Sequence, residues 1–225
     1  VAKNRIVCTC ATLRSTINKS SLSYICAILI CHSPSLMKLE CIFLDRDGVI
    51  DQERADYVKS WEEFELLPGS IEAVAQLSQL NIPIILITNQ SAIGRGAASR
   101  EAVDAIHNRL LKLIQERGGR LDEVFLCPHH PGESCECRKP KPGMLLQAAQ
   151  KYQINLNRAV FVGDAITDYQ AALAAGCSSI LLKSGRQALQ IETLVASHLQ
   201  TDAKAVLPEI FDNLSSAVQR ILTMT

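Results

Sequence analysis

Short apolar runs alternate with longer segments of helical periodicity from residue 39 onward. The apolar runs are rich in β-branched residues and lie at 40–45, 82–89, 123–127, 159–164 and 178–185. Segments with helical spacing lie at 70–80, 99–117, 143–152, 167–175 and 205–222. Runs that are apolar on both faces are typical of parallel strands covered by helices on both sides. The pattern therefore predicts a doubly wound α/β domain built on a parallel sheet.

The domain is expected to span residues 37–225 without a repeat or a second domain. The stretch 185–204 is poorly periodic and is predicted as a loop or a short surface helix. Residues 1–36 are rich in Ser and Cys, and Met37 is a candidate for the natural start. The apolar run "YICAILIC" at 24–31 is too short to span a bilayer. A cleaved signal peptide is the alternative interpretation of this segment.

Charge and cysteine content narrow the class of protein. The 23 basic and 23 acidic residues balance, so no net charge attracts the chain to nucleic acid or membrane. Four of the nine cysteines lie in the first 36 residues and three at 127–137. The odd number and the clustering favour reduced thiols over a disulfide framework. We expect a cytoplasmic monomer whose partner is a small molecule.

Polar side chains follow three of the predicted strands at their carboxyl ends. They are Asp45, Thr88 with Asn89, and Asp164. Ligands of open α/β sheets bind at this edge, so we expect these side chains to lie around one crevice. Asp47 follows Asp45 by two residues and precedes a glycine; an ordinary turn with a solvated strand end is the alternative.

A cluster of carboxylates and hydroxyls without histidine favours a hard cation, and Mg²⁺ is common beside phosphate. Asp168 is either a further member of this cluster or only the cap of the helix that follows. Thr88 can bond a phosphate oxygen, and Arg138 or Lys139 can neutralise its charge. The set of residue types therefore indicates phosphoryl-transfer chemistry.

The loop at 126–143 combines cysteines at 127, 135 and 137 with histidines at 129 and 130. Three cysteines and one histidine within eleven residues suit tetrahedral Zn²⁺, and four protein ligands leave no open position for catalysis. We expect a structural zinc that fixes the loop carrying Arg138 and Lys139. Free thiols or a redox pair are the alternatives, although a C-x-C disulfide would be strained.

Four segments in this order resemble the motifs of the haloacid dehalogenase superfamily of phosphohydrolases: "DRDGV", "TNQS", "RKPKPG" and "GDAITD". With "CPHHPGESCECRKP" they are similar to the branch that acts on heptose 1,7-bisphosphate or histidinol phosphate. The resemblance covers about residues 38–185, and residues 1–36 have no counterpart. It implies a Rossmann-like fold without a large cap domain, so the zinc loop would shape the substrate pocket.

The resemblance also implies a role for each matching residue. Asp45 would be the nucleophile that forms an aspartyl-phosphate, and Asp47 would be the general acid and base. Mg²⁺ would be held by Asp45, by the backbone carbonyl of Asp47 and by Asp164. The family pattern favours His129 over His130 as the zinc ligand beside Cys127, Cys135 and Cys137. The groups expected to hold the phosphoryl group or contact substrate are Thr88, Asn89, Gln90, Ser91, Arg138 and Lys139.

The resemblance further implies an activity, namely Mg²⁺-dependent removal of the 7-phosphate from D-glycero-D-manno-heptose 1,7-bisphosphate, a sugar-phosphate precursor of cell-surface lipopolysaccharide. Arg95 is a candidate contact for the second phosphate. One alternative is a histidinol-phosphate phosphatase. The other is a catalytically silent, zinc-stabilised binding module. His107 has no partner evident in the sequence and is expected at the surface.

Overall fold

The computed structural model describes residues 38–201 and 206–224, which form a six-stranded sheet. All paired strands are parallel, in the order β3-β2-β1-β4-β5-β6. The strands are β1 Cys41–Leu44, β2 Ile84–Asn89, β3 Glu123–Cys127, β4 Ala159–Gly163, β5 Ser178–Leu182 and β6 Glu209–Phe211. The expected parallel α/β fold is therefore confirmed.

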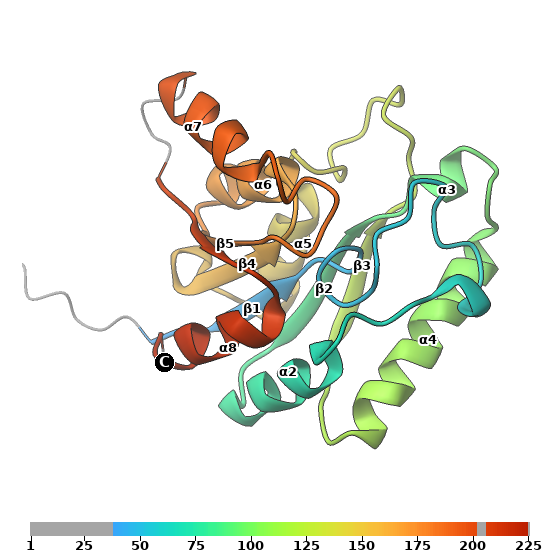
Figure 1. The fold of residues 1–225 in the computed structure, drawn as a ribbon, viewed down its shortest axis with the longest axis horizontal. Coiled ribbons are helices and arrows are strands. Elements are labelled where there is room, and N and C mark those ends of the chain that lie inside the picture. Colours follow the sequence, from blue (N-terminus) through green and yellow to red (C-terminus); the bar gives the residue numbers. More distant parts are fainter. Residues whose placement is uncertain (1–37, 202–205, 225) are drawn as a thin grey trace, which may run out of the picture. The chain divides into compact units, whose positions relative to one another are not determined.

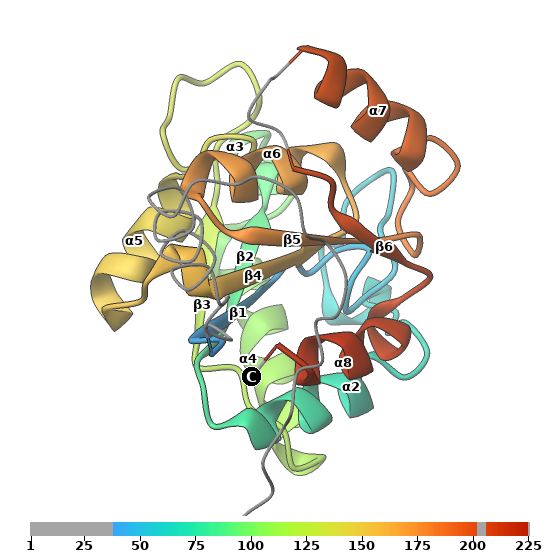
Figure 2. The same cartoon turned by 90° about the vertical axis from the view of Figure 1, so that its left-hand side faces the viewer.

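Helices cover both faces of the sheet (Figures 1 and 2). The α-helices are α2 Ser70–Leu77, α3 Ser91–Gly94, α4 Arg100–Glu116, α5 Gly143–Tyr152, α6 Ile166–Ala175, α7 Ile191–Thr201 and α8 Leu214–Leu222. Short 3-10 turns lie at Trp61–Glu63, Ser78–Leu80 and Leu156–Arg158. Figure 2 shows α2, α4 and α8 on one side of the sheet and α6 with α7 on the other. No helix of the described residues is long and apolar enough to cross a membrane.

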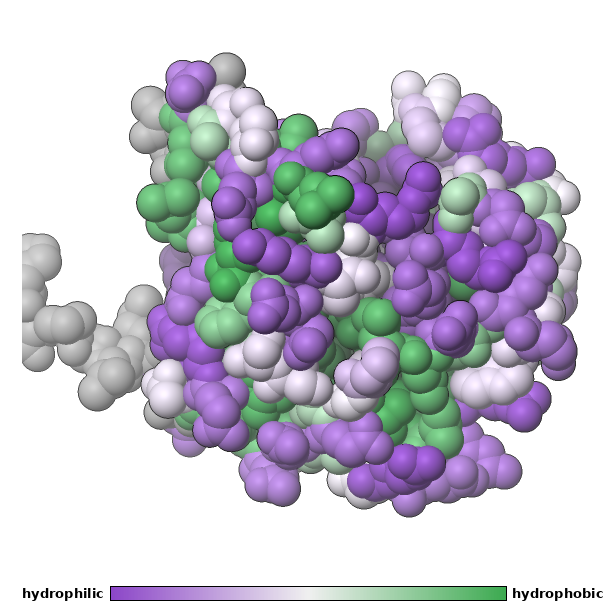
Figure 3. All heavy atoms as spheres, in the orientation of Figure 1, coloured by the Kyte–Doolittle hydropathy of each residue, from purple (hydrophilic) through white to green (hydrophobic). Residues whose placement is uncertain are grey.

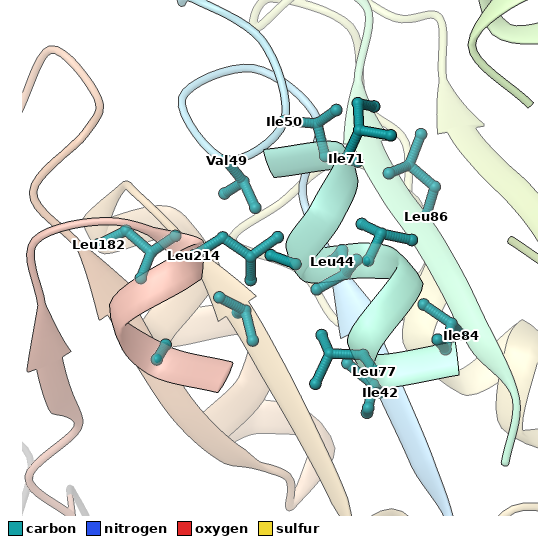
Figure 4. Close-up of a cluster of buried hydrophobic side chains, with 14 of the residues drawn as sticks. Ile42, Leu44, Val49, Ile50, Ile71, Leu77, Ile84, Leu86, Leu182 and Leu214 are labelled. Atoms are coloured by element: carbon teal, nitrogen blue, oxygen red, sulfur yellow. The ribbon is translucent and has the colours of Figure 1, made fainter. Parts of the chain in front are cut away.

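Alternate residues of the strands enter separate cores on the two faces of the sheet, because successive side chains of a strand point to opposite faces. On β1, Ile42 and Leu44 pack towards α2, α4 and α8, and Figure 4 shows this cluster with Leu77 and Leu214. Phe43 packs in the other core, with apolar residues of α5 and α6. The central strands are therefore buried on both faces, and their carboxyl ends have a fixed position.

The structure corrects the prediction for the last forty or so residues. Of the two alternatives predicted for 185–204, a loop or a short surface helix, the structure shows a helix, α7. The helix expected at 205–222 is instead a short strand, β6, followed by α8. The side chain of Asn213 accepts the N–H of Ser216 at 2.9 Å and caps α8. Residues 1–36 and their four cysteines lie outside the described residues, so the expectations for them stay predictions.

The order of the strands determines where a ligand can bind. After β1 the chain continues to β2 and β3 on one side, and it later returns to β4, which pairs with the opposite edge of β1. Such a reversal of strand order opens a crevice at the carboxyl ends. The residues that follow β1, β2 and β4 meet there.

Candidate active site and metal centres

The carboxyl ends of β1, β2 and β4 open onto a pocket of about 320 Å³. Hydrophilic side chains surround the hollow at the upper edge of the molecule (Figure 3). The expected residues that line the pocket are Asp45, Asp47, Asn89, Gln90, Ser91, Arg138, Lys139, Asp164 and Asp168. Thr88 is fully buried beneath them and is not part of the lining. Side chains from four separated segments of sequence thus come together.

Lys139 is the buried cation of the pocket. Its Nζ lies 2.8 Å from Oδ2 of Asp45 and 2.6 Å from Oδ1 of Asp168, and it donates to the carbonyl of Ile87. Its backbone is fixed as well, because Asn89 bonds its N–H and its carbonyl at 3.1 and 3.2 Å. The ammonium group is therefore held beside the carboxylate of Asp45, where it can neutralise an anion bound there.

Asp45, Asp164 and Asp168 place carboxylate oxygens within 4.8 Å of one another. The pKa of Asp45 is raised to about 7, mainly by burial; Lys139 opposes this rise, and Asp168 and Asp47 contribute to it. Asp164 is 3 % exposed, and its carboxylate makes no ion pair or hydrogen bond within residues 38–201 and 206–224. A divalent cation would satisfy this carboxylate and favour the ionised form of Asp45. The donor set fits Mg²⁺, which prefers carboxylate oxygens.

Asp168 has the capping role that the sequence left open. Its Oδ2 accepts the N–H groups of Asp164 and Ala165 at the start of α6, at 3.1 and 3.0 Å. Its Oδ1 faces Lys139. Asp168 thus orients both the backbone of Asp164 and the ammonium group of Lys139.

The carboxylate of Asp47 is held on both oxygens. Arg46 lies 2.6 Å from Oδ1, and Gln90 donates to Oδ2 at 2.9 Å. The same amide nitrogen of Gln90 lies 2.8 Å from the hydroxyl of Thr88. Asp47 is not among the carboxylates that gather within 4.8 Å of one another, and it lines the pocket together with Asp45. This position suits proton transfer better than metal ligation through the side chain.

The second cluster comprises Cys127, His129, Cys135 and Cys137, whose ligand atoms lie within 4.8 Å of one another. Nδ1 of His129 lies 3.5 and 3.3 Å from the sulfurs of Cys127 and Cys137, and no disulfide joins the cysteines. Neighbouring His130 points elsewhere and accepts the N–H of Gly132. Three sulfurs and one imidazole nitrogen at these separations fit a tetrahedral zinc site.

Comparisons with known proteins agree with this geometry. The profile of haloacid dehalogenase-like hydrolases matches residues 37–176. The chain belongs to this family of hydrolases.

Curated relatives of this hydrolase include D-glycero-beta-D-manno-heptose-1,7-bisphosphate 7-phosphatases. The one from Pseudomonas putida is 40 % identical over 187 residues, which cover 82 % of this chain and all of the relative. The one from Pseudomonas aeruginosa is 41 % identical over 177 residues, covering 76 % and 99 %. The expected membership of the haloacid dehalogenase family and the expected phosphomonoester hydrolase class are confirmed.

A solved relative has the same fold as this hydrolase. The crystal structure of D,D-heptose 1,7-bisphosphate phosphatase from Bordetella bronchiseptica, complexed with magnesium and phosphate, superposes with a TM-score of 0.73. It is 34 % identical and covers 83 % of this chain and all of its own. The protein from Burkholderia thailandensis with the same activity in its name has a TM-score of 0.58 at 26 % identity.

Sequence reasoning missed the loop at 183–187 of this hydrolase. Ser184 donates to the carbonyl of Gly48 at 2.6 Å, and the N–H of Arg186 donates to Glu53 at 2.9 Å. A Cβ on Gly185 would lie 1.7 Å from Oδ2 of Asp164. The loop therefore presses against the carboxylate of Asp164 and brings Arg186 to the pocket. A strand followed by "KSGR" at the carboxyl edge was the available signal.

The structure also corrects the expectation for His107, which is only 4 % exposed. Its Nε2 lies 3.3 Å from the guanidinium of Arg46, and burial, with a further contribution from Arg46, lowers the pKa of His107 to about 3. The partner is 61 positions away in the sequence, so no local pattern could reveal it.

Proposed function

We propose that this chain is a Mg²⁺-dependent phosphatase that removes the 7-phosphate of D-glycero-D-manno-heptose 1,7-bisphosphate. The observation that carries the proposal is the 40 % identity to a phosphatase of that name over its whole length. The pocket supports it, because buried carboxylates, a buried lysine and surrounding arginines are arranged for a phosphate ester.

In the first proposed step, the carboxylate of Asp45 attacks phosphorus and the bond from phosphorus to the C7 oxygen breaks. Asp47 gives its proton to the departing alkoxide, and an aspartyl-phosphate remains on Asp45. Lys139, 2.8 Å from Asp45, stabilises the negative charge of the transferring group. When bound at Asp45, Asp164 and the backbone carbonyl of Asp47, Mg²⁺ would supply further charge neutralisation and in-line positioning.

In the second step Asp47, now ionised, takes a proton from water as that water attacks the phosphorus of the aspartyl-phosphate. Inorganic phosphate leaves, and Asp45 regains its carboxylate. Gln90 supports this step by holding Asp47, and the hydroxyl of Thr88 accepts a hydrogen bond from the same amide nitrogen of Gln90. Both half-reactions thus use the same two aspartates in opposite protonation states of Asp47.

Arginines at the pocket support a substrate with a second phosphate. Arg54 is paired with Asp56, and Arg138 donates to the carbonyl of His129. The side chains of Arg95 and Arg186 line the pocket and make no hydrogen bond or ion pair to any other described residue. We assign the C1 phosphate to these two guanidinium groups, which suit phosphate recognition.

The remaining expectations complete the proposal. Zn²⁺ at Cys127, His129, Cys135 and Cys137 would be structural and would fix the loop that carries Arg138. A cytoplasmic monomer formed by residues 37–225 remains our prediction.

The test is phosphate release from heptose 1,7-bisphosphate and from histidinol phosphate, measured side by side with Mg²⁺. The β anomer, named in the relatives, is the first substrate to use. We expect preference for the bisphosphate and loss of turnover in Asp45→Asn with the fold intact. Residual turnover of this variant above about a tenth of wild type contradicts Asp45 as nucleophile. Preference for histidinol phosphate moves the assignment to that substrate, and inactivity on every phosphate ester indicates a silent binding module.

A further inference from the structure

Arg46 stands between the two central aspartates in sequence, yet its side chain does not line the pocket. It is 0 % exposed and is among the largest fully buried side chains of the described residues. Its guanidinium lies 2.6 Å from Oδ1 of Asp47, 3.4 Å from Oδ1 of Asp51 and 3.3 Å from Nε2 of His107. It also stacks over Phe64, 5.7 Å from the ring centroid. One side of the guanidinium thus faces the proposed acid and base.

A buried guanidinium is stable only when it is paired. Asp51 is 0 % exposed, and neither of its carboxylate oxygens has a hydrogen-bond partner, so Arg46 is its one ion-pair partner among the described residues. His107 is buried and can accept a hydrogen bond from Arg46 through Nε2 when neutral. Asp51 and His107 thus contact the guanidinium in addition to Asp47.

The backbone around Arg46 is equally constrained. Its carbonyl accepts the N–H groups of Val49, Ile50 and Asp51 at 3.2, 2.8 and 3.2 Å. This turn brings Asp51 back under the segment that carries Asp45 and Asp47. Neither the main chain nor the side chain of Arg46 can move without breaking several buried contacts.

We propose that Arg46 is a positioning residue for the reaction: anchored by Asp51 and His107, it fixes the carboxylate of Asp47 for proton transfer. The inference rests on the acid–base role given to Asp47 under the proposed function. Arg46 contacts one carboxylate oxygen of Asp47 and Gln90 contacts the other, which leaves Asp47 few alternative rotamers. Correct placement of a catalytic group within about 1 Å is worth a large factor in rate.

The test is a double-variant cycle on kcat with Arg46→Gln and Asp47→Asn. Arg46→Gln should lower kcat at least about tenfold, a part of the 10²–10⁴ that acid–base catalysis supplies, with KM and zinc content unchanged. In the Asp47→Asn background, Arg46→Gln should change the residual kcat by less than about twofold, because its only route to the reaction is gone. Arg46→Lys should restore part of kcat.

A merely structural ion pair predicts a different result. Arg46→Gln would then lower kcat by the same factor in wild type and in Asp47→Asn, and this loss would follow the melting temperature. That outcome overturns the proposal, and so does an Arg46→Gln enzyme whose kcat stays within about twofold of wild type. Arg158→Gln is the matched control, since it removes a 2.6 Å pair with Glu40 that does not line the pocket.

If Arg46→Gln fails to fold, two further variants test the same idea. The pair Arg46→Gln with Asp51→Asn removes the buried guanidinium and the buried carboxyl group together, and His107→Gln weakens only the anchor. Both should lower kcat without raising KM, and unchanged kcat in both overturns the proposal. The assay uses whichever phosphate ester the wild type hydrolyses, p-nitrophenyl phosphate included. Failure on heptose bisphosphate therefore counts against the substrate and not against Arg46.

Discussion

Gly185→Ala should weaken the binding of Mg²⁺ more than it weakens the fold. The added Cβ would lie 1.7 Å from Oδ2 and 2.5 Å from Cγ of Asp164, where real contacts exceed 3.0 Å. One of the two groups must therefore shift by at least about 1 Å. Gly185 does not adopt a left-handed conformation, so alanine adds no backbone strain of its own. The perturbation acts through the proposed metal ligand.

Magnesium tolerates little change in the placement of its ligands, because it requires near-octahedral geometry at about 2.0–2.1 Å. Displacing groups around a metal site typically lowers affinity by about 10- to 100-fold. We expect the Mg²⁺ concentration for half-maximal turnover to rise by this factor. Titrating Mg²⁺ into wild-type and variant enzyme at saturating substrate measures the change.

Gly118→Ala is the control, because nothing lies within 4 Å of a Cβ placed there. Its φ of +77° means that alanine costs about 1 kcal/mol of stability, with no expected change in the Mg²⁺ requirement. A Gly185→Ala enzyme whose Mg²⁺ requirement stays within about twofold of wild type would refute the contact between this loop and Asp164.

Two further predictions concern the zinc cluster and the buried histidine. Cys137→Ser should abolish equimolar zinc in metal analysis and lower turnover, because Arg138 donates to the carbonyl of the zinc ligand His129. A zinc-free variant with full activity would show that turnover does not depend on the zinc cluster. Burial lowers the pKa of His107 from 6.5 to about 3 in the folded protein. Between pH 3 and pH 6.5 the unfolded chain therefore binds a proton on His107 that the folded protein does not. Stability should fall by up to about 1.4 kcal/mol per pH unit below pH 6.5. His107→Gln should remove that component from the difference between urea unfolding at pH 7 and pH 5, and an unchanged difference contradicts the assignment.

Hydrophobic periodicity predicted the five longer strands because each contains an apolar run, and β1, β2 and β4 are in addition buried on both faces. Asp45 and Asp164 could be predicted from the same pattern, since each follows such a strand directly. The strand β6 escaped prediction because it has only three residues, all partly exposed. The start of α8 could have been predicted from Asn213, whose side chain caps the helix, but hydrophobic periodicity does not take helix caps into account.

The contacts that shape the pocket depend on residues far apart in the chain. Ser184 bonds a residue 136 positions away, and Gly185 contributes by having no side chain at all. A pattern of residue types cannot reveal either effect, because each depends on which backbone segments approach each other in the folded protein. The close approach of Gly185 to the carboxylate of Asp164 becomes visible only when the strands are placed in order.

The burial of the Arg46 side chain could have been predicted by a physical argument, although the motif alone does not indicate it. A charged residue placed between two aspartates at the end of a central strand either reaches solvent or must find partners inside. The turn that follows is short and apolar, "GVI", and returns to Asp51, so burial was the more consistent expectation. An inward guanidinium needs a carboxylate beside it, and Asp51 is the first acidic residue after the turn. The same reasoning applies wherever a charged residue alternates with catalytic carboxylates at a strand end. Its buried partners then belong to the site, although they never touch the substrate.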